Sequence, residues 1–398
     1  MKLLFVHERF GALGGAESNI LATADALQRR GYVLGLAHGA STHKDEKIWL
    51  DTFPQRFALS PDSAQTDLLK ALALFEPDAV YVHKMSDSSV VETLVNSGVP
   101  LVGMVHDHDL CCLKSYKYNF FTRQICGRAL SPYCVFPCGG CVTRNQNGGL
   151  KWSSYSSKRM ELQLYRQFHR LIVATHFMSD ELLANGFDAE RIEIHPPVPP
   201  TGESLLRANF SSRNFIIFVG QIIRGKGVDV LLESLKHVRV PFECLIFGDG
   251  NHRAHCEKLS SKLGLTDHIH FKGYVSPEEL KHYYTECSVA VVSSVWPEPF
   301  GAVGLEAMRY GLPVVAFDAG GIKEWLSDGH NGYLVPWMDR VAFAGRVEEL
   351  LRDKMLAREM GENGRHLVNE HFEFSKYING LENLFRRVIS ERTQLIAA

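Results

Sequence analysis

Short apolar runs alternate with amphipathic segments along most of the chain. The stretch between the first two runs has apolar positions at helical spacing, and Gly31 follows it as a stop signal. Strands that alternate with helices predict βα units and parallel sheets, so the chain is expected to belong to the α/β class. The runs with the length and composition of β-strands form two series: residues 3–7, 33–37, 79–83, 101–106 and 171–174, and residues 215–219, 243–247, 268–271, 289–293 and 313–317.

A proline cluster separates the two series. Residues 195–203 read HPPVPPTGE, and four prolines in nine residues exclude a helix or a central strand. We therefore predict two doubly wound, Rossmann-like domains, residues 1–197 and 198–373, which face a cleft and hold the ligand at the carboxyl ends of their strands. The alternative is one large sheet with insertions, but the proline cluster lies near the middle of the chain and argues against it.

The composition is that of a globular protein without a strong charge bias. Of 398 residues, 45% are hydrophobic and 22% are charged, and the formal net charge of −2 gives no global reason to expect nucleic-acid binding. The apolar run at residues 3–6 is too short for a signal peptide, and no stretch approaches the roughly 18 uncharged apolar residues of a membrane span. We therefore expect a cytoplasmic protein, in which thiols stay reduced.

Two glutamates flank an apolar segment in WPEPFGAVGLEAMRYGLPVVA, residues 296–316. A Gly-Leu-Pro sequence ends a helix that must begin near Gly301, where backbone N–H groups lack intrahelical partners and a phosphate can approach them. Glu298 precedes this helix, and Glu306 lies about one and a half turns inside it, where a carboxylate can accept from sugar hydroxyls. The pair favours a ligand with phosphates between sugars, such as a nucleotide sugar. The alternative is a pair of solvent-exposed acids at a helix start.

Together with four other segments, this stretch resembles a known family. The other segments are GALGGAES (residues 11–18), LIVATHFMSDELLANGFDAERIEIHPP (171–197), FVGQIIRGKGVDVLLESL (218–235) and DAGGIKEWLSDGHNGYLVP (318–336). The chain is similar to the retaining GT-B glycosyltransferases of glycosyltransferase family 4, also called glycosyl transferases group 1, whose signature is E-x7-E. The resemblance covers nearly the whole chain. It implies an acceptor-binding first domain, a donor-binding second domain and a helix over residues 374–398 that crosses back to the first.

The resemblance assigns roles to individual positions. Glu306 would bind the ribose hydroxyls, Glu298 would lie beside the donor sugar, and Lys226 would neutralise the leaving diphosphate. His106 matches a histidine near the reacting centre. The family usually carries Arg where this chain has Gln221, and a cation from the nearby loop would have to replace it. The remaining donor-binding positions that the resemblance implies are Gly14, Gly15, Gly220, Gln221, Arg224, Phe300, Gly301, Ala302 and Val303.

The implied activity is transfer of a hexose from a nucleotide diphosphate sugar to a carbohydrate or lipid-linked acceptor. Family members proceed with retention, without a divalent metal, through a front-face path. One alternative is a sugar-nucleotide epimerase or a phosphorylase with the same fold. Another is a non-catalytic, metal-stabilised binding subunit, for which Gln221 is the support. The DHD sequence at residues 107–109 resembles the metal site of GT-A glycosyltransferases, but three residues match by chance often, and that fold is different.

Six of the nine cysteines fall within residues 111–141. They include one C-x2-C motif, and four thiolates are enough for a closed, tetrahedral zinc site. Some members of the family are similar here. The rival interpretations are an iron–sulfur cluster, free thiols or redox-sensitive disulfides. The hypothesis of a structural zinc uses Cys112, Cys126, Cys138 and Cys141, with Cys111 and Cys134 as substitutes.

The region around the cysteines is also basic. Residues 111–170 contain ten Lys or Arg and a single acid, Glu161, with aromatic residues interleaved. Such a face on the acceptor domain would suit an anionic acceptor or the inner face of an anionic membrane. A solvated helix face balanced by acids elsewhere is the alternative, and no nucleic-acid-binding module accompanies the patch. Its basic residues beyond the cysteines include Lys151, Lys158, Arg159, Arg166 and Arg170.

Overall fold

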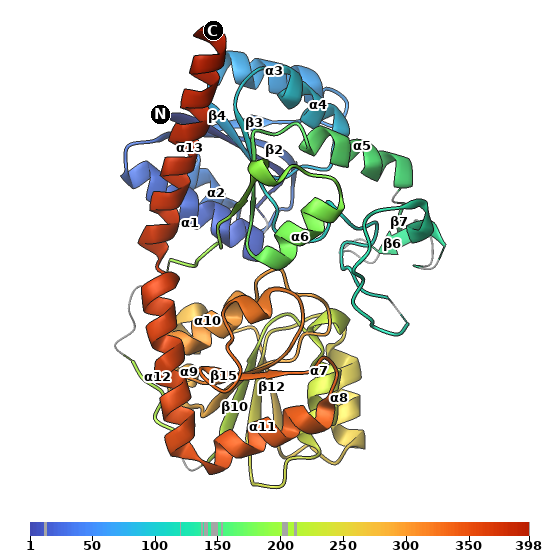
Figure 1. Cartoon of the computed structure of the whole chain (residues 1–398), viewed down its shortest axis with the longest axis vertical. Helices are drawn as coiled ribbons and strands as arrows, with labels where there is room; N and C mark the ends of the chain where they lie inside the picture. Colours follow the sequence, from blue (N-terminus) through green and yellow to red (C-terminus); the bar gives the residue numbers. More distant parts are fainter. Residues whose placement is uncertain are drawn as a thin grey trace. The chain divides into compact units, whose positions relative to one another are not determined.

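The computed structural model describes residues 1–11, 14–119, 121–136, 138, 142–144, 150–152, 154–200, 206–210 and 213–397. The chain forms two compact units, and each is built on its own parallel sheet (Figure 1). Unit 1 comprises Met1–Tyr116, Gly127–Pro200 and Phe374–Ala398, whereas unit 2 comprises Lys117–Cys126 and Thr201–Glu373. The predicted α/β class with two parallel-sheet domains is therefore confirmed.

The sheet of unit 1 has seven strands in the order β3-β2-β1-β4-β5-β8-β9, and all of its pairings are parallel. Central strands such as LVGM in β5 are buried along their whole length, as in a parallel sheet covered by helices on both faces. The strands are β1 (Lys2–Phe10), β2 (Val33–Ser41), β3 (Gln55–Ala58), β4 (Ala79–Lys84), β5 (Leu101–Met104), β8 (Arg170–Val173) and β9 (Ile192–Ile194).

Three helices of unit 1, α4, α5 and α6, begin at a residue whose side chain caps the helix. The side chain of Asp87 accepts hydrogen bonds from the backbone of Ser89 and Val90 at the start of α4. The first helix ends where predicted, because Gly31 follows it with a φ of 85°. The helices are α1 (Gly15–Arg29), α2 (Glu46–Thr52), α3 (Ala64–Phe75), α4 (Ser88–Asn96), α5 (Tyr155–Tyr165), α6 (His176–Ala184) and α13 (Phe374–Ala397).

Unit 2 has a six-stranded parallel sheet in the order β12-β11-β10-β13-β14-β15. In Figure 1, α7 and α8 lie on one side of this sheet, and α9 and α10 lie on the other. Its strands are β10 (Phe215–Val219), β11 (Glu243–Phe247), β12 (Ile269–Gly273), β13 (Val289–Val292), β14 (Val314–Phe317) and β15 (Gly332–Val335). Its helices are α7 (Val228–Leu235), α8 (Arg253–Lys262), α9 (Pro277–Glu286), α10 (Ala302–Arg309), α11 (Arg340–Arg352) and α12 (Lys354–His371).

The strand order of each sheet reverses at one point. In unit 1 the reversal falls between β1 and β4, and in unit 2 it falls between β10 and β13. Loops that leave two such strands diverge to opposite faces of the sheet, so the carboxyl ends of the strands frame a crevice in which ligands of doubly wound proteins bind. The fold thus points to the loops after β10 and β13 as a candidate site.

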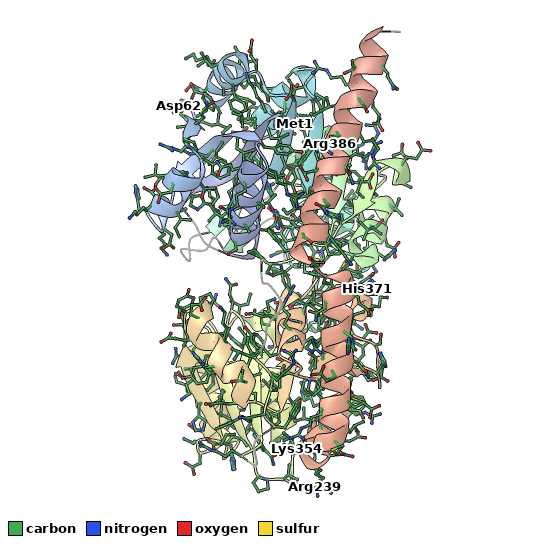
Figure 2. All side chains as sticks on the ribbon, turned by 90° about the vertical axis from the view of Figure 1, so that its left-hand side faces the viewer. Met1, Asp62, Arg239, Lys354, His371 and Arg386 are labelled. Atoms are coloured by element: carbon green, nitrogen blue, oxygen red, sulfur yellow. The ribbon has the colours of Figure 1, made fainter. Side chains whose placement is uncertain are left out.

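The last helix, α13, packs on unit 1. The ring of Phe385 meets Tyr81 of β4 edge-on, at 5.2 Å between ring centroids. The ring nitrogen Nε2 of His195 lies 2.7 Å from the carbonyl oxygen of Tyr377, and Arg170 pairs with Glu391. Figure 2 labels Arg386 in this helix and His371 at the end of α12.

Three features differ from the predicted layout. Residues Lys117–Cys126 were assigned to the first domain with the rest of the cysteine-rich segment, but they fold as part of unit 2. Strands β3, β9 and β15 were not predicted, because they are short and lie at or near sheet edges. A small antiparallel pair, β6 (Val142–Arg144) with β7 (Leu150–Trp152), follows the cysteine-rich segment of residues 111–141 and was not predicted. Within the described residues, no helix is both long and apolar enough to cross a membrane.

Candidate active site

Lys226 and Glu298 meet at the point where the strand order of unit 2 reverses. Lys226 follows β10, Glu298 follows β13, and the Nζ atom of Lys226 lies 2.6 Å from Oε1 of Glu298. The carboxylate side chain is 5% exposed, and the lysine side chain is 23% exposed. The two residues are 72 positions apart in sequence, and the fold brings them together after the carboxyl ends of β10 and β13, where doubly wound proteins bind their ligands.

The loop that carries Lys226 is fixed by the backbone that follows β13. The amides of Val295 and Trp296 both donate to the carbonyl oxygen of Gly225, at 2.9 and 3.1 Å, and the hydroxyl of Ser293 donates to the carbonyl of Lys226. Gly227 has a φ of 67°, and a Cβ there would collide with the carbonyl oxygen of Ser293. The lysine is therefore presented from a rigid base.

Glu298 is held in place by both its side chain and its backbone. Its amide donates to the carbonyl of Ala319, and its own carbonyl accepts from the amide of Gly321 at 2.7 Å. Burial raises the pKa of this carboxyl, but the charge of Lys226 and hydrogen bonds from Lys226 and Ser294 outweigh it, so the net pKa is lowered. The group is thus a buried, ionised carboxylate at neutral pH.

The helix predicted to begin near Gly301 does so. Gly301 is the N-cap of α10 with a φ of 79°, a conformation that favours glycine. The indole nitrogen of Trp325 donates to the carbonyl oxygen of Phe300 at 2.6 Å, which fixes the chain just before the helix. The amides of Ala302 and Val303 lie in the first turn, where they have no intrahelical acceptor and carry the positive end of the dipole.

Glu306 lies further along α10 and is partly buried. Burial raises the pKa of its carboxyl, and this effect exceeds the opposing influence of Arg309 and Tyr284. A carboxyl group removed from water in this way is stabilised when it accepts hydrogen bonds from the hydroxyl groups of a ligand.

The loop after β10 is pinned to the loop after β11. The amide of Gly220 donates to Phe247, and the amide of Ile222 donates to Asp249. Gln221 between them is exposed, and Arg224 is the first residue of a short 3-10 turn, η3 (Arg224–Lys226), that ends at the lysine. The position at which the family usually has Arg therefore carries an exposed, uncharged amide.

The other predicted site residues lie in unit 1. Gly14 is the N-cap of α1 and Gly15 is its first residue, directly after β1. Glu17 in the same turn lies 3.5 Å from Nε2 of His7. Burial would raise the pKa of Glu17, but the contact with His7 and the charge of Arg9 lower it to about 2.

His106 follows β5, where it forms a pair with another buried histidine. Its Nε2 atom lies 2.9 Å from Nδ1 of His83, and the two rings stack at 5.2 Å. Burial lowers the pKa of His106 to about 4, and the influence of Asp107 offsets this only in part. The imidazole is therefore neutral at physiological pH.

A charged pocket next to His106 was not foreseen from the sequence. Lys84 at the end of β4 lies 3.1 Å from Asp107 and 3.4 Å from Asp109. The pocket has a volume of about 30 Å³, room for about one water molecule, and Glu161 also lines it. These contacts give the DHD sequence a structural explanation, because its two acids face a lysine and His108 contacts Glu181. The feature of the sequence that could have indicated this pocket is Lys84, a lysine at the end of a strand.

Two residues of the basic face predicted after the cysteines are paired with acids. Lys158 is buried and lies 2.6 Å from Glu161, and Arg170 lies 2.8 Å from Glu391. Of the zinc ligands in the hypothesis, Cys112 is in unit 1 and Cys126 is in unit 2, and both are partly exposed, as is Cys138. Cys141 lies outside the described residues, and so do the side chains of residues 142–152.

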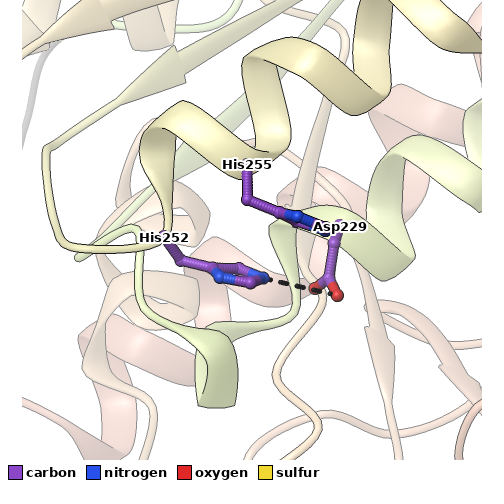
Figure 3. A group of neighbouring side chains, drawn as sticks. All are labelled: Asp229, His252 and His255. Atoms are coloured by element: carbon purple, nitrogen blue, oxygen red, sulfur yellow. Dashed lines mark ion pairs between the residues drawn. The ribbon is translucent and has the colours of Figure 1, made fainter.

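Within the described residues, one group has side-chain spacing suitable for a metal ion. It consists of Asp229 in α7, His252 and His255, whose ligand atoms all lie within 4.8 Å of one another (Figure 3). The carboxylate of Asp229 is also bound by the guanidinium of Arg123, with Nη1 3.2 Å from Oδ1 and Nη2 in contact with Oδ2. A cation here would have to share both oxygens with an arginine, so we assign the group to an ion-pair network.

Comparisons with known proteins cover both halves of the chain. Residues 13–199 match the family described as Glycosyltransferase Family 4, and residues 207–367 match the family described as Glycosyl transferases group 1. An uncharacterized glycosyltransferase of Methanocaldococcus jannaschii is 31% identical over 45% of this chain and 50% of its own length. A D-inositol 3-phosphate glycosyltransferase of Streptomyces bingchenggensis is 31% identical over 54% of this chain and 52% of its own length. The chain thus spans about half the length of the curated relatives it matches.

Solved structures match over the whole chain at lower identity. The Anabaena protein HepE in complex with UDP superposes with a TM-score of 0.75 and 20% identity, covering 97% of this chain and 100% of that one. The same protein with UDP-glucose gives a TM-score of 0.69 and 18% identity, with 100% and 99% coverage. At this identity the likeness establishes the fold. The first half of the chain thus matches one glycosyltransferase family model and the second half matches another, and its fold of two parallel-sheet units is similar to that of HepE.

Proposed function

We propose that this chain is a retaining glycosyltransferase that moves a hexose from a nucleotide diphosphate sugar to a carbohydrate or lipid-linked acceptor. The observation that carries the proposal is the contact between Lys226 and Glu298 at the point where the strand order of unit 2 reverses. Glu298 precedes the start of α10 by a few residues in the sequence. A cation, a helix start and an ionised carboxylate at one crevice suit a diphosphate joined to a sugar. Relatives named as glycosyltransferases and a similar fold described with UDP and UDP-glucose support the same donor class.

The chemistry follows from the charges in the crevice. As the bond between the anomeric carbon and the phosphate oxygen breaks, negative charge grows on the nucleoside diphosphate. In the proposed mechanism, Lys226 and the amides of Ala302 and Val303 stabilise that charge, and Glu306 holds the ribose hydroxyls. The acceptor hydroxyl forms the new bond on the same face of the sugar, and its proton passes to the departing phosphate oxygen. No protein base and no divalent metal are required in this scheme.

The residues that contact Lys226 define its role in the resting protein. Glu298 holds the ammonium group through an ion pair, and the Trp296 ring centroid lies 5.2 Å from Nζ. A diphosphate that enters the site would share the lysine with this carboxylate. Glu298 would then lie beside the donor sugar, as the family resemblance implies.

The charged pocket of unit 1 supports a polar acceptor. Lys84, Asp107 and Asp109 present donors and acceptors beside His106, at the carboxyl ends of β4 and β5. Such groups can form hydrogen bonds with the hydroxyls of a sugar, and Met85, Met104 and Leu110 add apolar surface to the same pocket. Contact with an anionic membrane surface is the weaker part of the proposal, because Lys158 and Arg170 are already paired with acids.

A structural zinc ion in the cysteine-rich segment and a cytoplasmic location complete the proposal. Both rest on the sequence, and the zinc site would use Cys112, Cys126, Cys138 and Cys141 as thiolate ligands. Cys112 precedes the Lys117–Cys126 segment in the sequence and Cys126 is its last residue, so an ion that bound both would close the base of that segment.

The proposal is tested by turnover assays with the full chain. UDP-, GDP- and ADP-hexoses are incubated with and without simple glycosides and lipid-linked sugars, and release of nucleoside diphosphate is measured in the presence of a chelator. Release that requires an acceptor, with the anomeric configuration of the donor kept in the product by NMR, is the expected result. Interconversion of the free sugar nucleotide indicates an epimerase, and dependence on phosphate indicates a phosphorylase. Binding without turnover indicates a non-catalytic subunit, and Glu298→Ala is the inactive control.

A further inference from the structure

A hairpin from the first half of the sequence is built into the donor half of the molecule. The chain leaves unit 1 at Tyr116, contributes residues Lys117–Cys126 to unit 2, and returns to unit 1 at Gly127. We call the described residues of this segment, 117–119 and 121–126, the hairpin. It is closed by a backbone hydrogen bond from Cys126 to Lys117 and by the antiparallel bridge between Tyr118 and Ile125.

The tip of the hairpin is a tight turn with its own capping side chain. The side-chain oxygen of Asn119 accepts from the amides of Phe121 and Thr122, at 2.9 and 3.0 Å. The amide of Arg123 donates to the carbonyl of Asn119. Arg123 itself has a φ of 62°, a conformation that a non-glycine residue adopts at a cost and that persists only where surrounding contacts enforce it.

The contact that enforces it is the ion pair with Asp229. Both oxygens of the carboxylate accept from the guanidinium, and the two side chains are each 11% exposed. A bidentate ion pair that is largely excluded from water fixes the relative orientation of the two side chains as well as the distance between them. Asp229 is in the first turn of α7, three residues after Lys226, so the pair fastens the hairpin directly behind the proposed diphosphate loop.

The hairpin also touches that loop. Tyr118 is 9% exposed, and a Cβ built on Gly225 would lie 3.6 Å from its ring and 3.3 Å from Trp296. Both aromatic side chains, one from the hairpin and one from the segment after β13, therefore lie on the side of Gly225 to which a Cβ would point. Its neighbour Lys226 is the residue whose position matters for the donor.

We propose that the hairpin is a positioning element of the donor site, in which the Arg123–Asp229 ion pair holds Tyr118 against Gly225 and so sets the position of Lys226. This inference rests on the proposed function, because it takes Lys226 as the group that binds the diphosphate. Arg123 and Asp229 act through the loop and touch neither substrate. Without the Arg123–Asp229 ion pair, the ligand must order the loop when it binds, and the free-energy cost of that ordering weakens the affinity.

The same network accounts for the group in Figure 3. His252 Nε2 lies 3.5 Å from Oδ2 of Asp229, and its ring stacks on His255 at 4.6 Å. Burial lowers the pKa of His252, so the ring beside the Arg123–Asp229 pair is neutral. The carboxylate charge is compensated by the arginine, and the histidines pack beside a completed pair.

The experiment compares nucleoside diphosphate binding in matched variants by calorimetry. UDP, GDP and ADP identify the preferred base, and the corresponding nucleoside serves as a probe that lacks the diphosphate. Arg123→Ala is expected to weaken the diphosphate by roughly tenfold and the nucleoside little. Arg123→Lys keeps the positive charge but loses the bidentate geometry, so its affinity for the diphosphate should lie between those of wild type and Arg123→Ala. Arg352→Ala, which removes an exposed pair with Glu348 on α11, is the control and should bind as wild type does.

A double variant separates positioning from stability. Arg123→Ala leaves a buried, unpaired carboxylate, so Tm should fall, and Arg123→Ala/Asp229→Asn removes that charge and should recover Tm. The affinity for the nucleoside diphosphate should stay weak in both variants, because neither has the Arg123–Asp229 ion pair. Recovery of affinity together with Tm would show a merely structural pair. Equal affinity in wild type and Arg123→Ala overturns the inference and leaves the proposed function standing, whereas a wild type that binds none of the diphosphates overturns both. A Zn²⁺-induced rise in Tm that His255→Ala abolishes would also overturn it, since it would make the group a metal site.

Discussion

Lys226 and Glu298 form a 2.6 Å ion pair at the place where the strand order of unit 2 reverses. The pair joins two stretches that resembled separate family motifs in the sequence. The lysine proposed to bind the diphosphate therefore also has a carboxylate as a partner. The balance between this carboxylate and a diphosphate is therefore open to measurement.

Glu298→Gln should separate binding from turnover. The substitution removes the negative charge that competes for Lys226, so nucleoside diphosphate affinity should be unchanged or higher. Turnover should fall by about 10²–10³-fold, the usual cost of losing a charged group beside a reacting centre. Calorimetry and initial rates provide the two numbers. A variant that turns over as fast as wild type would remove Glu298 from the site.

Glu306 is expected to read the ribose. Wild type should bind the preferred nucleoside diphosphate about tenfold more tightly than its 2′,3′-dideoxy analogue, because the buried carboxyl loses its hydroxyl donors in the analogue. Glu306→Ala should bring that ratio close to one. Glu359→Ala, an exposed acid on α12, should keep the wild-type ratio. An unchanged ratio in Glu306→Ala would contradict the assignment.

His106 should make the protein less stable in acid. Its pKa is lowered from 6.5 to about 4 by burial, so between these values the unfolded chain binds more protons than the folded one. The stability contribution is complete above pH 6.5 and is lost as pH falls towards 4. From about pH 6.5 to pH 5, wild type should lose about 2 kcal/mol more than His106→Gln in urea titrations. Parallel pH profiles would show that the site is not buried in solution.

The zinc hypothesis predicts a stoichiometric metal. Purified full chain should contain about one equivalent of zinc, and Cys126→Ser or Cys138→Ser should lose it. Cys287→Ala, a buried thiol of unit 2, should keep the metal. Less than about half an equivalent of any transition metal in the wild type would leave the cysteines without this role.

The fold was largely legible in the sequence because its signals are local. Runs such as FIIFV and VAVV are buried over most of their length, and continuous apolar runs are the strongest evidence for strands of a parallel sheet. Strand β3, QRFA, has no such run because it lies at the sheet edge and is mostly exposed. Strand β15, GYLV, has only three apolar residues in a row after a glycine, which is too short a run to distinguish a strand from a buried turn.

The site was legible only in part, because its remaining contacts are long-range. Gly301 and Glu306 could be placed from helix signals, and the start of α10 agrees with that prediction. Arg123 and Asp229 are 106 positions apart, and neither residue type nor spacing indicates the pair. Assigning the hairpin to the first domain followed chain order, whereas its packing follows a buried ion pair. Sequence periodicity carries no information about which unit a short polar segment joins.

The most direct test of the account is calorimetric titration of the full chain with UDP, GDP and ADP, repeated with Lys226→Ala and with Lys236→Ala, an exposed lysine after α7. The account predicts that at least one of the three nucleoside diphosphates binds to the wild type and to Lys236→Ala with equal affinity. The same compound should bind to Lys226→Ala at least about tenfold more weakly, because Lys226→Ala lacks the cation that faces the diphosphate. If none of them binds wild type, or if Lys226→Ala binds as tightly, the account is contradicted.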